Sequence, residues 1–243
     1  MYDNGLIRFL RNAYWLQDLV VRTATAVHPG MEHYWAKIAA LKKAFFFVNL
    51  DDVPGDYVEF GVFQGTSFVS ALRAHLITRT NAAQARTFWG FDSFQGLRYT
   101  SEGDRHPSWT EGEFKADYER TRRRIARRFG SKAAWQLVPG FFEDTIANQT
   151  APHRGIHKAA VVLIDCDLRQ PAWIALEFVE PALQEGSIVL FDEFLGYGGS
   201  REKGEAAAFE EFRRNHPNLV FRSAFEYGLG GRGFILASRS GQK

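Results

Sequence analysis

The stretch Glu59-Phe60-Gly61-Val62-Phe63-Gln64-Gly65-Thr66-Ser67 decides the fold of this chain. It joins the apolar run 57–62 to a turn with two glycines and then to a helical pattern of apolar residues. Short apolar runs of this kind alternate with helical segments, and they cover residues 57–62, 87–92, 135–138, 159–164, 186–191, 219–222 and 233–237. Because the central runs lack polar alternation, they indicate strands covered on both faces. The pattern predicts an α/β fold with a doubly wound, mostly parallel sheet.

The first fifty residues lie outside this alternation. They are helical in pattern and rich in apolar and aromatic side chains, ending in Phe45-Phe46-Phe47-Val48. We therefore predict a helical N-terminal extension over residues 1–50 and one main domain over residues 51–243. Apolar surface outside a core usually marks an interface or a groove. We expect the extension to join two copies of the chain as a homodimer, or to cover the molecule on which the protein acts.

Composition narrows the class of protein. Charged residues make up 24% and hydrophobic residues 45% of the 243 residues, which excludes a disordered chain. The net charge of +2 is too small to indicate a nucleic-acid partner by itself. The sequence has no apolar run long enough to cross a membrane and no leader pattern, and its one cysteine, Cys166, cannot form an intrachain disulfide. We expect a cytoplasmic protein with no membrane partner.

Acidic residues end several of the predicted strands. Glu59, Asp92 and Asp165 each stand at or just after an apolar run, and Asp192-Glu193 follow another. The carboxyl ends of parallel strands meet at one edge of the sheet, where ligands of such folds bind. Clustered carboxylates repel one another. This edge therefore needs a cation, or a ligand that donates hydrogen bonds.

The first three strand ends predict a nucleoside cofactor. Gly61 and Gly65 allow a ligand to approach the backbone, but their spacing fits neither dinucleotide nor phosphate loops. An acid at the first strand suits an ammonium group, Asp92 suits ribose hydroxyls, and the segment 140–142 offers an apolar slot for a purine. These features together describe S-adenosylmethionine. The predicted cofactor residues are Glu59, Gly61, Phe63, Gly65, Thr66, Ser67, Asp92, Ser93, Phe94, Gly140, Phe141 and Phe142.

The other strand ends predict a metal site. Asp165, Asp192 and Glu193 form an oxygen-only set of ligands, which suits Mg²⁺, with Ca²⁺ or Mn²⁺ as alternatives. Such an ion would bind an acceptor hydroxyl and lower its pKa. Asp165 is also the candidate catalytic residue, as the group that accepts the hydroxyl proton.

Four stretches of this sequence resemble the macrocin O-methyltransferase family. They are the opening stretch 59–67, Phe91-Asp92-Ser93-Phe94-Gln95-Gly96-Leu97, Gly140-Phe141-Phe142-Glu143-Asp144-Thr145, and Asp165-Cys166-Asp167 with Asp192-Glu193-Phe194. The resemblance covers residues 55–215. It implies a Rossmann-like, seven-stranded class I methyltransferase fold and the use of S-adenosylmethionine and Mg²⁺ to methylate a hydroxyl of a sugar-bearing small molecule. It also places the metal ligands of the family on Asp165, Asp192 and Glu193.

The chain departs from the family pattern at two places beside the expected acceptor. Leu168-Arg169-Gln170-Pro171 stands where the family has a Tyr-Glu-Ser-Thr-like stretch. Asp192-Glu193-Phe194 stands where the family has Asp-Asp-Tyr. The resemblance therefore supports the cofactor better than the acceptor.

A basic segment leaves another class of function open. Residues 115–132 carry a net charge of +6, which an RNA methyltransferase could set against phosphates. We favour a solvated helix face, with Ile125 and Phe129 turned inward, since the helix lacks interleaved aromatic residues for base stacking. A non-catalytic cofactor-binding protein is the further alternative.

The loops 98–113 and 195–203 are expected to cover the acceptor.

Overall fold

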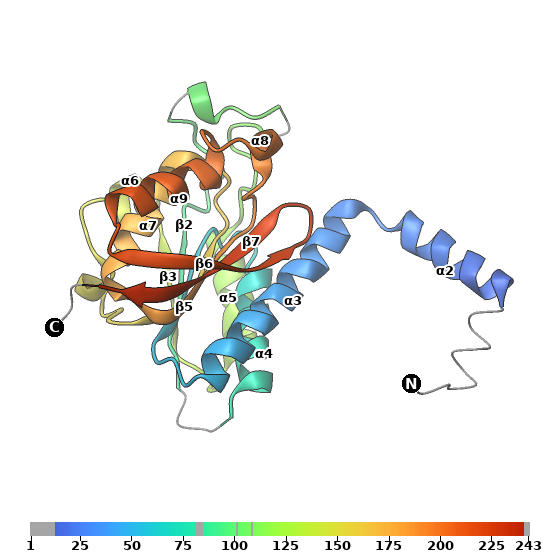
Figure 1. The fold of residues 1–243 in the computed structure, drawn as a ribbon, viewed down its shortest axis with the longest axis horizontal. Helices are drawn as coiled ribbons and strands as arrows, with labels where there is room; N and C mark the ends of the chain where they lie inside the picture. Colours follow the sequence, from blue (N-terminus) through green and yellow to red (C-terminus); the bar gives the residue numbers. More distant parts are fainter. Residues whose placement is uncertain (1–12, 81–84, 101, 108, 241–243) are drawn as a thin grey trace.

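The computed structural model describes residues 13–80, 85–100, 102–107 and 109–240. This part of the chain forms one seven-stranded sheet with the order β3-β2-β1-β4-β5-β7-β6 (Figure 1). The strands are β1 Asp56–Phe60, β2 Phe88–Asp92, β3 Trp135–Pro139, β4 Ala159–Ile164, β5 Leu183–Phe191, β6 Leu219–Tyr227 and β7 Gly231–Arg239. Strands β1 to β5 are parallel, whereas β7 is antiparallel to both β5 and β6. The prediction of an α/β, seven-stranded, mostly parallel sheet is confirmed.

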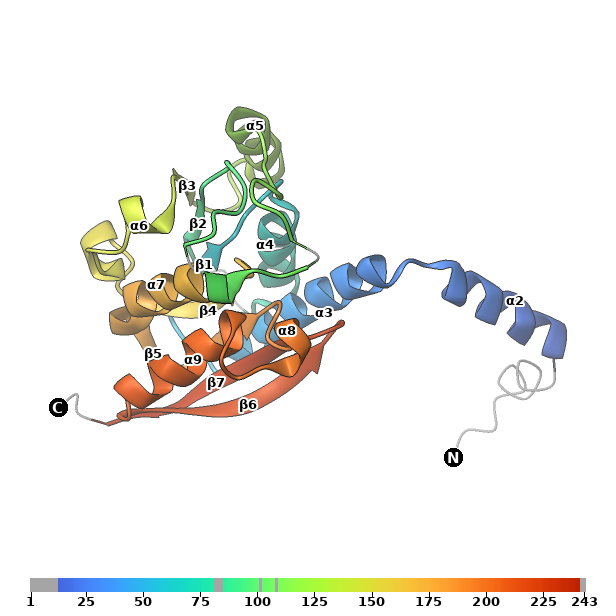
Figure 2. The ribbon, with the colours of Figure 1, turned by 90° about the horizontal axis from the view of Figure 1, so that it is seen from above.

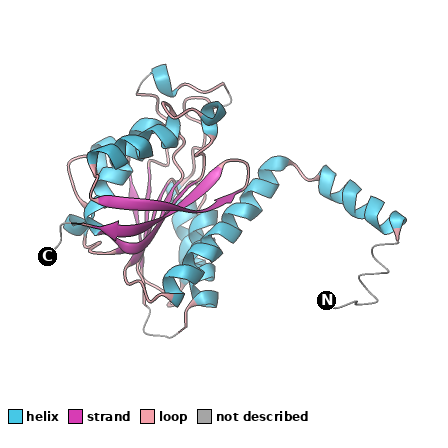
Figure 3. Cartoon of the chain, in the orientation of Figure 1, coloured by secondary structure: helices cyan, strands magenta, loops and turns pink. Residues whose placement is uncertain are grey.

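Helices cover both faces of the sheet. One face carries α3, α4 and α5, and the other carries α6, α7 and α9 (Figures 2 and 3). The helices are α2 Tyr14–Ala26, α3 Pro29–Leu50, α4 Thr66–Thr78, α5 Tyr118–Phe129, α6 Phe142–Thr145, α7 Arg169–Val179, α8 Gly196–Gly199 and α9 Gly204–Asn215, with short 3₁₀ turns at Glu102–Asp104, Ala151–Arg154 and Glu180–Ala182.

The two faces follow from the alternation of side chains along each strand. In β4, Val162 and Ile164 pack in the core beneath α7 and α9, whereas Val161 and Leu163 pack in the core beneath α3 and α4. All six residues of β4 are buried. A strand covered on both faces must be apolar throughout, which explains the uninterrupted apolar run in the sequence.

Several element ends differ from those expected. Helix α7 begins at Arg169, and Pro171 falls in its first turn, where the missing N–H costs no helical hydrogen bond. Strand β5 begins at Leu183, ahead of the predicted apolar run 186–191. Strands β6 and β7 extend beyond their predicted limits because they pair with each other along a long antiparallel ribbon.

The N-terminal extension contains two helices with different surroundings. Helix α3 packs against α4 and the sheet, and its buried residues include Leu41 and Phe45. Helix α2 has no buried residue and projects away from the sheet (Figures 1 and 2). Residues 1–12 of the predicted extension lie outside the described residues. Among the described residues, the helices include none that is both long and apolar enough to span a membrane.

Candidate active site

A cavity of about 290 Å³ opens at the carboxyl ends of strands β1 to β5. Its lining draws on the loops after each of these strands and on helix α3. The predicted site residues that line it are Gly61, Phe63, Asp92, Ser93, Phe141, Phe142, Asp165, Asp192 and Glu193. The predicted residues that do not line it are Glu59, Gly65, Thr66, Ser67, Phe94 and Gly140. The sheet edge chosen from the sequence is therefore the edge that holds the cavity.

Asp92, at the end of β2, is fixed by two backbone donors. The N–H of Phe63 donates to its Oδ2 atom at 2.6 Å, and the N–H of Phe94 donates to its Oδ1 atom at 2.5 Å. Both phenylalanines have positive φ angles, of 48° and 56°, which turn their N–H groups toward the carboxylate. A carboxylate has about four acceptor positions, so Asp92 keeps acceptor capacity toward the cavity.

Glu59 is closed off from the cavity. Its side chain is fully buried, and its two oxygens accept hydrogen bonds from the Tyr57 and Ser67 hydroxyls, each at 2.5 Å. Burial raises its pKa to about 8, although these two hydrogen bonds act in the opposite direction. A direct contact with an ammonium group would require one hydroxyl to release the carboxylate. Glu59 and Ser67 therefore support the loop from behind, and their predicted contact with a cofactor stays a prediction.

The predicted purine slot has a charged cover. The Arg98 guanidinium lies 3.7 Å from the centre of the Phe141 ring and donates to Glu143 at 3.0 Å. Both Arg98 and Phe141 line the cavity. A flat guanidinium over an aromatic ring resembles the stacking that holds a planar base.

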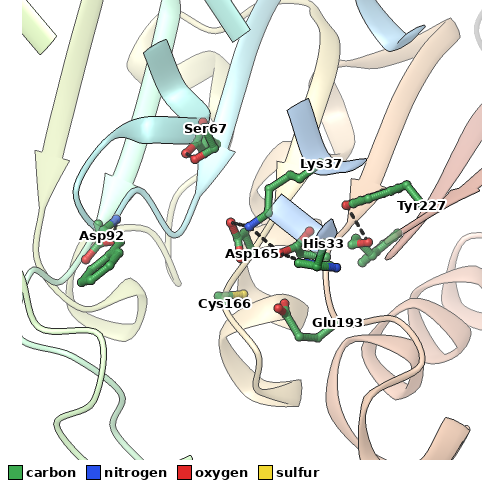
Figure 4. A network of polar contacts seen from close by, with 12 residues as sticks. His33, Lys37, Ser67, Asp92, Asp165, Cys166, Glu193 and Tyr227 are labelled. Carbon is green, nitrogen blue, oxygen red and sulfur yellow. Dashed lines mark hydrogen bonds and ion pairs between the residues drawn. The ribbon is translucent and has the colours of Figure 1, made fainter. Parts of the chain in front are cut away.

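The acidic end of the cavity contains a lysine that the sequence analysis did not select. Lys37, on α3, donates from Nζ to Asp165 Oδ2 at 2.8 Å and forms a second, close ion pair with Asp192 Oδ2 (Figure 4). Its side chain is 13% exposed, against 18% for Asp165 and 1% for Asp192. The ammonium group therefore lies between two of the three carboxylates that were predicted to hold a metal ion.

His33, one helical turn before Lys37, supports the same cluster. Its Nε2 lies 3.0 Å from Asp192 Oδ2, and its Nδ1 accepts the N–H of Leu229 at 3.0 Å. Because Nδ1 is an acceptor, Nε2 carries the proton and donates it to Asp192. The ring also stacks on Tyr227, whose hydroxyl donates to the Phe191 carbonyl. The turn between β6 and β7 thus fixes His33 over Asp192.

The surroundings separate the pKa values of these acids. Burial raises the pKa of Asp165 to about 7 even though the charge of Lys37 opposes that change. Burial acts in the same direction on Asp192, but Lys37 and His33 outweigh it and hold the pKa of Asp192 below its usual value. Burial lowers the pKa of Lys37, but the charges of Asp165, Asp192 and Glu193 outweigh this and raise it well above its usual value. The ion pair of Lys37 and Asp192 is therefore fully charged at neutral pH.

A further buried acid, Glu205, accepts hydrogen bonds from both acidic loops, the one after β4 and the one after β5. It lies at the start of α9, is fully buried, and accepts the N–H of Cys166 at 3.2 Å and the N–H of Glu193 at 3.0 Å. Burial and neighbouring carboxyl groups raise the pKa of Glu205 and of Glu193 well above their usual values, and that of Asp167 to about 8. These three acids therefore bind a proton more readily than exposed carboxyl groups do.

The two predicted cover loops meet each other. Tyr197 donates to the Asp104 carbonyl at 2.6 Å, and its ring contacts those of His106 and Trp109 edge-on at 5.0 and 5.3 Å. The backbone N–H of Arg169 donates to the Asp104 carboxylate at 3.0 Å, which joins the loops to the start of α7. The loops form one aromatic layer beside the cavity.

His33 and Lys37 were not predicted as site residues, but one feature of the sequence points to them. His33, Lys37 and Leu41 recur every four residues and therefore share one face of α3, and Leu41 is fully buried. A lysine on the inward face of an amphipathic helix needs a buried partner. The sequence offered five acids at the sheet edge as that partner, but it did not indicate how α3 crosses the sheet.

The fold resembles that of known methyltransferases. The structure of CalS11, a calicheamicin methyltransferase, matches this chain with a TM-score of 0.68 at 21% identity, covering 100% of this chain and 95% of that one. The fold is thus that of the class I O-methyltransferases. The sequence matches the macrocin-O-methyltransferase (TylF) family over residues 33–219. The chain belongs to the macrocin-O-methyltransferase family.

Two curated relatives bear on the acceptor. A Streptomyces olivaceus protein named 8-demethyl-8-(2,3-dimethoxy-alpha-L-rhamnosyl)-tetracenomycin-C 4'-O-methyltransferase is 32% identical over 179 residues, which cover 68% of this chain and 64% of the relative. The demethyldecarbamoylnovobiocin O-methyltransferase of Streptomyces niveus is 31% identical over 154 residues, covering 60% of this chain and 55% of the relative. The chain thus spans less than two thirds of the length of either.

Proposed function

We propose that this protein is an S-adenosylmethionine-dependent O-methyltransferase that acts on a hydroxyl of a sugar-bearing or other small-molecule metabolite. One observation carries the proposal: Asp92 and Asp165, the expected ribose ligand and proton acceptor, line one cavity. Membership of the macrocin-O-methyltransferase family supports the reaction. The names of both curated relatives describe O-methylation of natural products, one of them on a rhamnosyl group, which supports the acceptor class.

The cavity divides into a cofactor part and an acceptor part. We assign cofactor contact to the predicted residues that line it, and a supporting role to the predicted residues behind them. The contacting residues are Gly61, Phe63, Asp92, Ser93, Phe141 and Phe142, and the supporting residues are Glu59, Gly65, Thr66, Ser67, Phe94 and Gly140. The acceptor part lies at Asp165, Asp192 and Glu193.

Asp165 serves as the general base in this proposal. The acceptor hydroxyl oxygen attacks the methyl carbon of the sulfonium, the carbon–sulfur bond breaks, and its electron pair leaves on sulfur as a neutral thioether. The hydroxyl proton passes to the Asp165 carboxylate. A pKa near 7 suits this task, because the group is ionised often enough to act and basic enough to take the proton.

The magnesium ion predicted from the sequence is not part of this proposal. Asp165, Asp192 and Glu193 all line the cavity, but Lys37 lies between the first two, and His33 also uses Asp192 Oδ2. His33, Asp192 and Glu193 offer ligand atoms within 4.8 Å of one another, yet both ring nitrogens of His33 are engaged. The residues present do not fit a divalent ion while Lys37 keeps its place.

Two measurements test the proposed activity. Calorimetry should detect binding of S-adenosylhomocysteine to the purified protein, and NAD should not compete. Incubation with S-adenosylmethionine and a panel of glycosylated acceptors should yield a product heavier by one methylene group. If S-adenosylhomocysteine binds and no small acceptor is methylated, the non-catalytic cofactor-binding protein becomes the better interpretation.

The basic helix does not favour an RNA substrate in this structure. Thr121, Ile125 and Phe129 form the buried face of α5, and its arginines are exposed. Arg122 pairs with Glu119 within the same helix, and Arg124 donates to the Gln64 carbonyl. This arrangement fits a solvated helix face. RNA oligonucleotides in the same acceptor panel would test the alternative directly.

We further propose that the protein forms a homodimer through α2. This helix has no buried residue, yet it exposes large apolar side chains, among them Trp15 at 67% and Val20 at 58%. Apolar surface of this extent marks an interface. A second copy of the chain is the partner that we propose.

Cys166 is buried and unpaired, which fits the cytoplasm as the predicted compartment.

A further inference from the structure

We propose that the ammonium group of Lys37 takes the place of the divalent cation of the family, so that the acceptor site works without a bound metal ion. The inference rests on the proposed function. It concerns the acidic end of the cavity, where Lys37 contacts both Asp165 and Asp192. It makes Lys37 a positioning residue, which acts through the two carboxylates it holds.

The geometry leaves no room for both cations between Asp165 Oδ2 and Asp192 Oδ2. Lys37 Nζ lies 2.8 Å from Asp165 Oδ2 and closer still to Asp192 Oδ2. A magnesium ion that bridged the same oxygens would lie about 2.0–2.1 Å from each of them. The two positions overlap, and two like charges at contact distance repel strongly in a buried site. Asp165 and Asp192 therefore hold either the ammonium or the metal.

The rest of the cluster does not restore a metal site. His33 accepts the Leu229 N–H at Nδ1 and donates from Nε2 to Asp192, so its ring keeps no free lone pair for a metal. Asp192 Oδ1 and Glu193 Oε2 are buried and have no hydrogen-bond partner among the described residues. As acceptors beside an ammonium, these two oxygens suit the hydroxyl donors of an acceptor molecule.

The charge balance of methyl transfer agrees with one monovalent cation. Before reaction, the carboxylates of Asp165 and Asp192 are balanced by Lys37 and by the sulfonium of the cofactor. In the reaction the sulfur becomes a neutral thioether, and the hydroxyl proton neutralises Asp165. Lys37 and Asp192 remain as a pair, so this group of charges sums to zero before and after the step.

Binding of Mn²⁺, followed by its electron paramagnetic resonance signal, tests the inference without relying on activity. Three proteins are compared: the wild type, Lys37→Ala, and Lys42→Ala as a control that removes an exposed lysine from the same helix. We expect the wild type and Lys42→Ala to leave Mn²⁺ free. We expect Lys37→Ala, with its carboxylates released, to bind about one equivalent of the ion.

Methyl transfer by the same proteins provides the second measurement. We expect wild-type turnover to be unchanged by EDTA and by added Mg²⁺, and turnover of Lys37→Ala to fall and then recover partly on addition of Mg²⁺. Stoichiometric Mn²⁺ binding by the wild type, abolished by Asp192→Asn, would overturn the inference. That result does not involve Lys37→Ala, so it stands even if this variant fails to fold. Calorimetry with S-adenosylhomocysteine reports separately on the proposed function.

Discussion

A side-chain carbon on Gly61 would lie 1.7 Å from the carbonyl oxygen of Asp165. These two residues directly follow the neighbouring strands β1 and β4, and the N–H of Asp165 donates to the Phe60 carbonyl at 2.8 Å. Gly61 has a φ of +95°, a conformation that residues with a side chain rarely adopt. Position 61 therefore requires glycine, because a side chain there would collide with the backbone of Asp165, which lines the cavity.

Gly61→Ala should prevent normal folding or lower the free energy of unfolding by roughly 3 kcal/mol or more, since a buried backbone oxygen cannot move aside. Gly112→Ala is the matched control: its φ is +82°, but an added carbon there meets nothing within 4 Å. The control should lose only about 1–2 kcal/mol from backbone strain. Urea denaturation measures both, and equal losses would contradict the steric explanation.

The sequence predicted which edge of the sheet forms the candidate site, but it did not predict all of the side chains that lie there. The ends of β1, β2, β4 and β5 were predictable, because apolar runs ending in acids are a local signal and parallel strands bring their carboxyl ends together. Lys37 was not predictable, because its place depends on the angle at which α3 crosses the sheet. Glu59 shows another limit: its position was correct, but two neighbouring hydroxyls engage its carboxylate.

Asp92→Ala should weaken the binding of S-adenosylhomocysteine by about 1–3 kcal/mol, because hydrogen bonds from the ribose to a carboxylate are lost. Calorimetry measures the change. Asp51→Ala is a suitable control, since Asp51 is exposed and does not line the cavity. Unchanged affinity in a folded Asp92→Ala protein would remove Asp92 from the cofactor site.

Glu59→Gln should stabilise the protein increasingly as the pH rises. Burial raises the pKa of Glu59 from 4.5 to about 8 in the folded protein. The unfolded chain therefore releases this proton first, and the stability that neutral Glu59 contributes is complete below pH 4.5 and is lost as the pH rises through 8. Glutamine keeps the shape and cannot ionise. Thermal melts at pH 5 and pH 8.5, with exposed Glu111→Gln as control, should show a gap that widens only for Glu59→Gln.

Trp15→Glu and Val20→Glu should convert the proposed homodimer to a monomer, because each places a charge on the apolar surface of α2. Light scattering at micromolar concentration measures the mass. Ile77→Glu, which changes an apolar residue on α4 that is 71% exposed, should leave the mass unaltered. A monomeric wild-type protein would leave α2 with the other predicted role, that of covering the acceptor.

Asp165→Asn should lower kcat by about 10²–10⁴-fold, the usual contribution of a general base, while the affinity for S-adenosylhomocysteine stays within about twofold.

Only the ionised carboxylate can accept the hydroxyl proton, so wild-type kcat should rise as the pH increases through the Asp165 pKa of about 7. The positive charge of Lys37 lowers that pKa, and its removal should move the rise to higher pH. Stopped assays across pH 5.5 to 9 in Lys37→Ala and Lys42→Ala would separate this effect from a general loss of structure, because only the first variant removes the charge beside Asp165. A kcat that is level across this range in the wild type, with methyl transfer rather than product release limiting, would show that Asp165 is not the base.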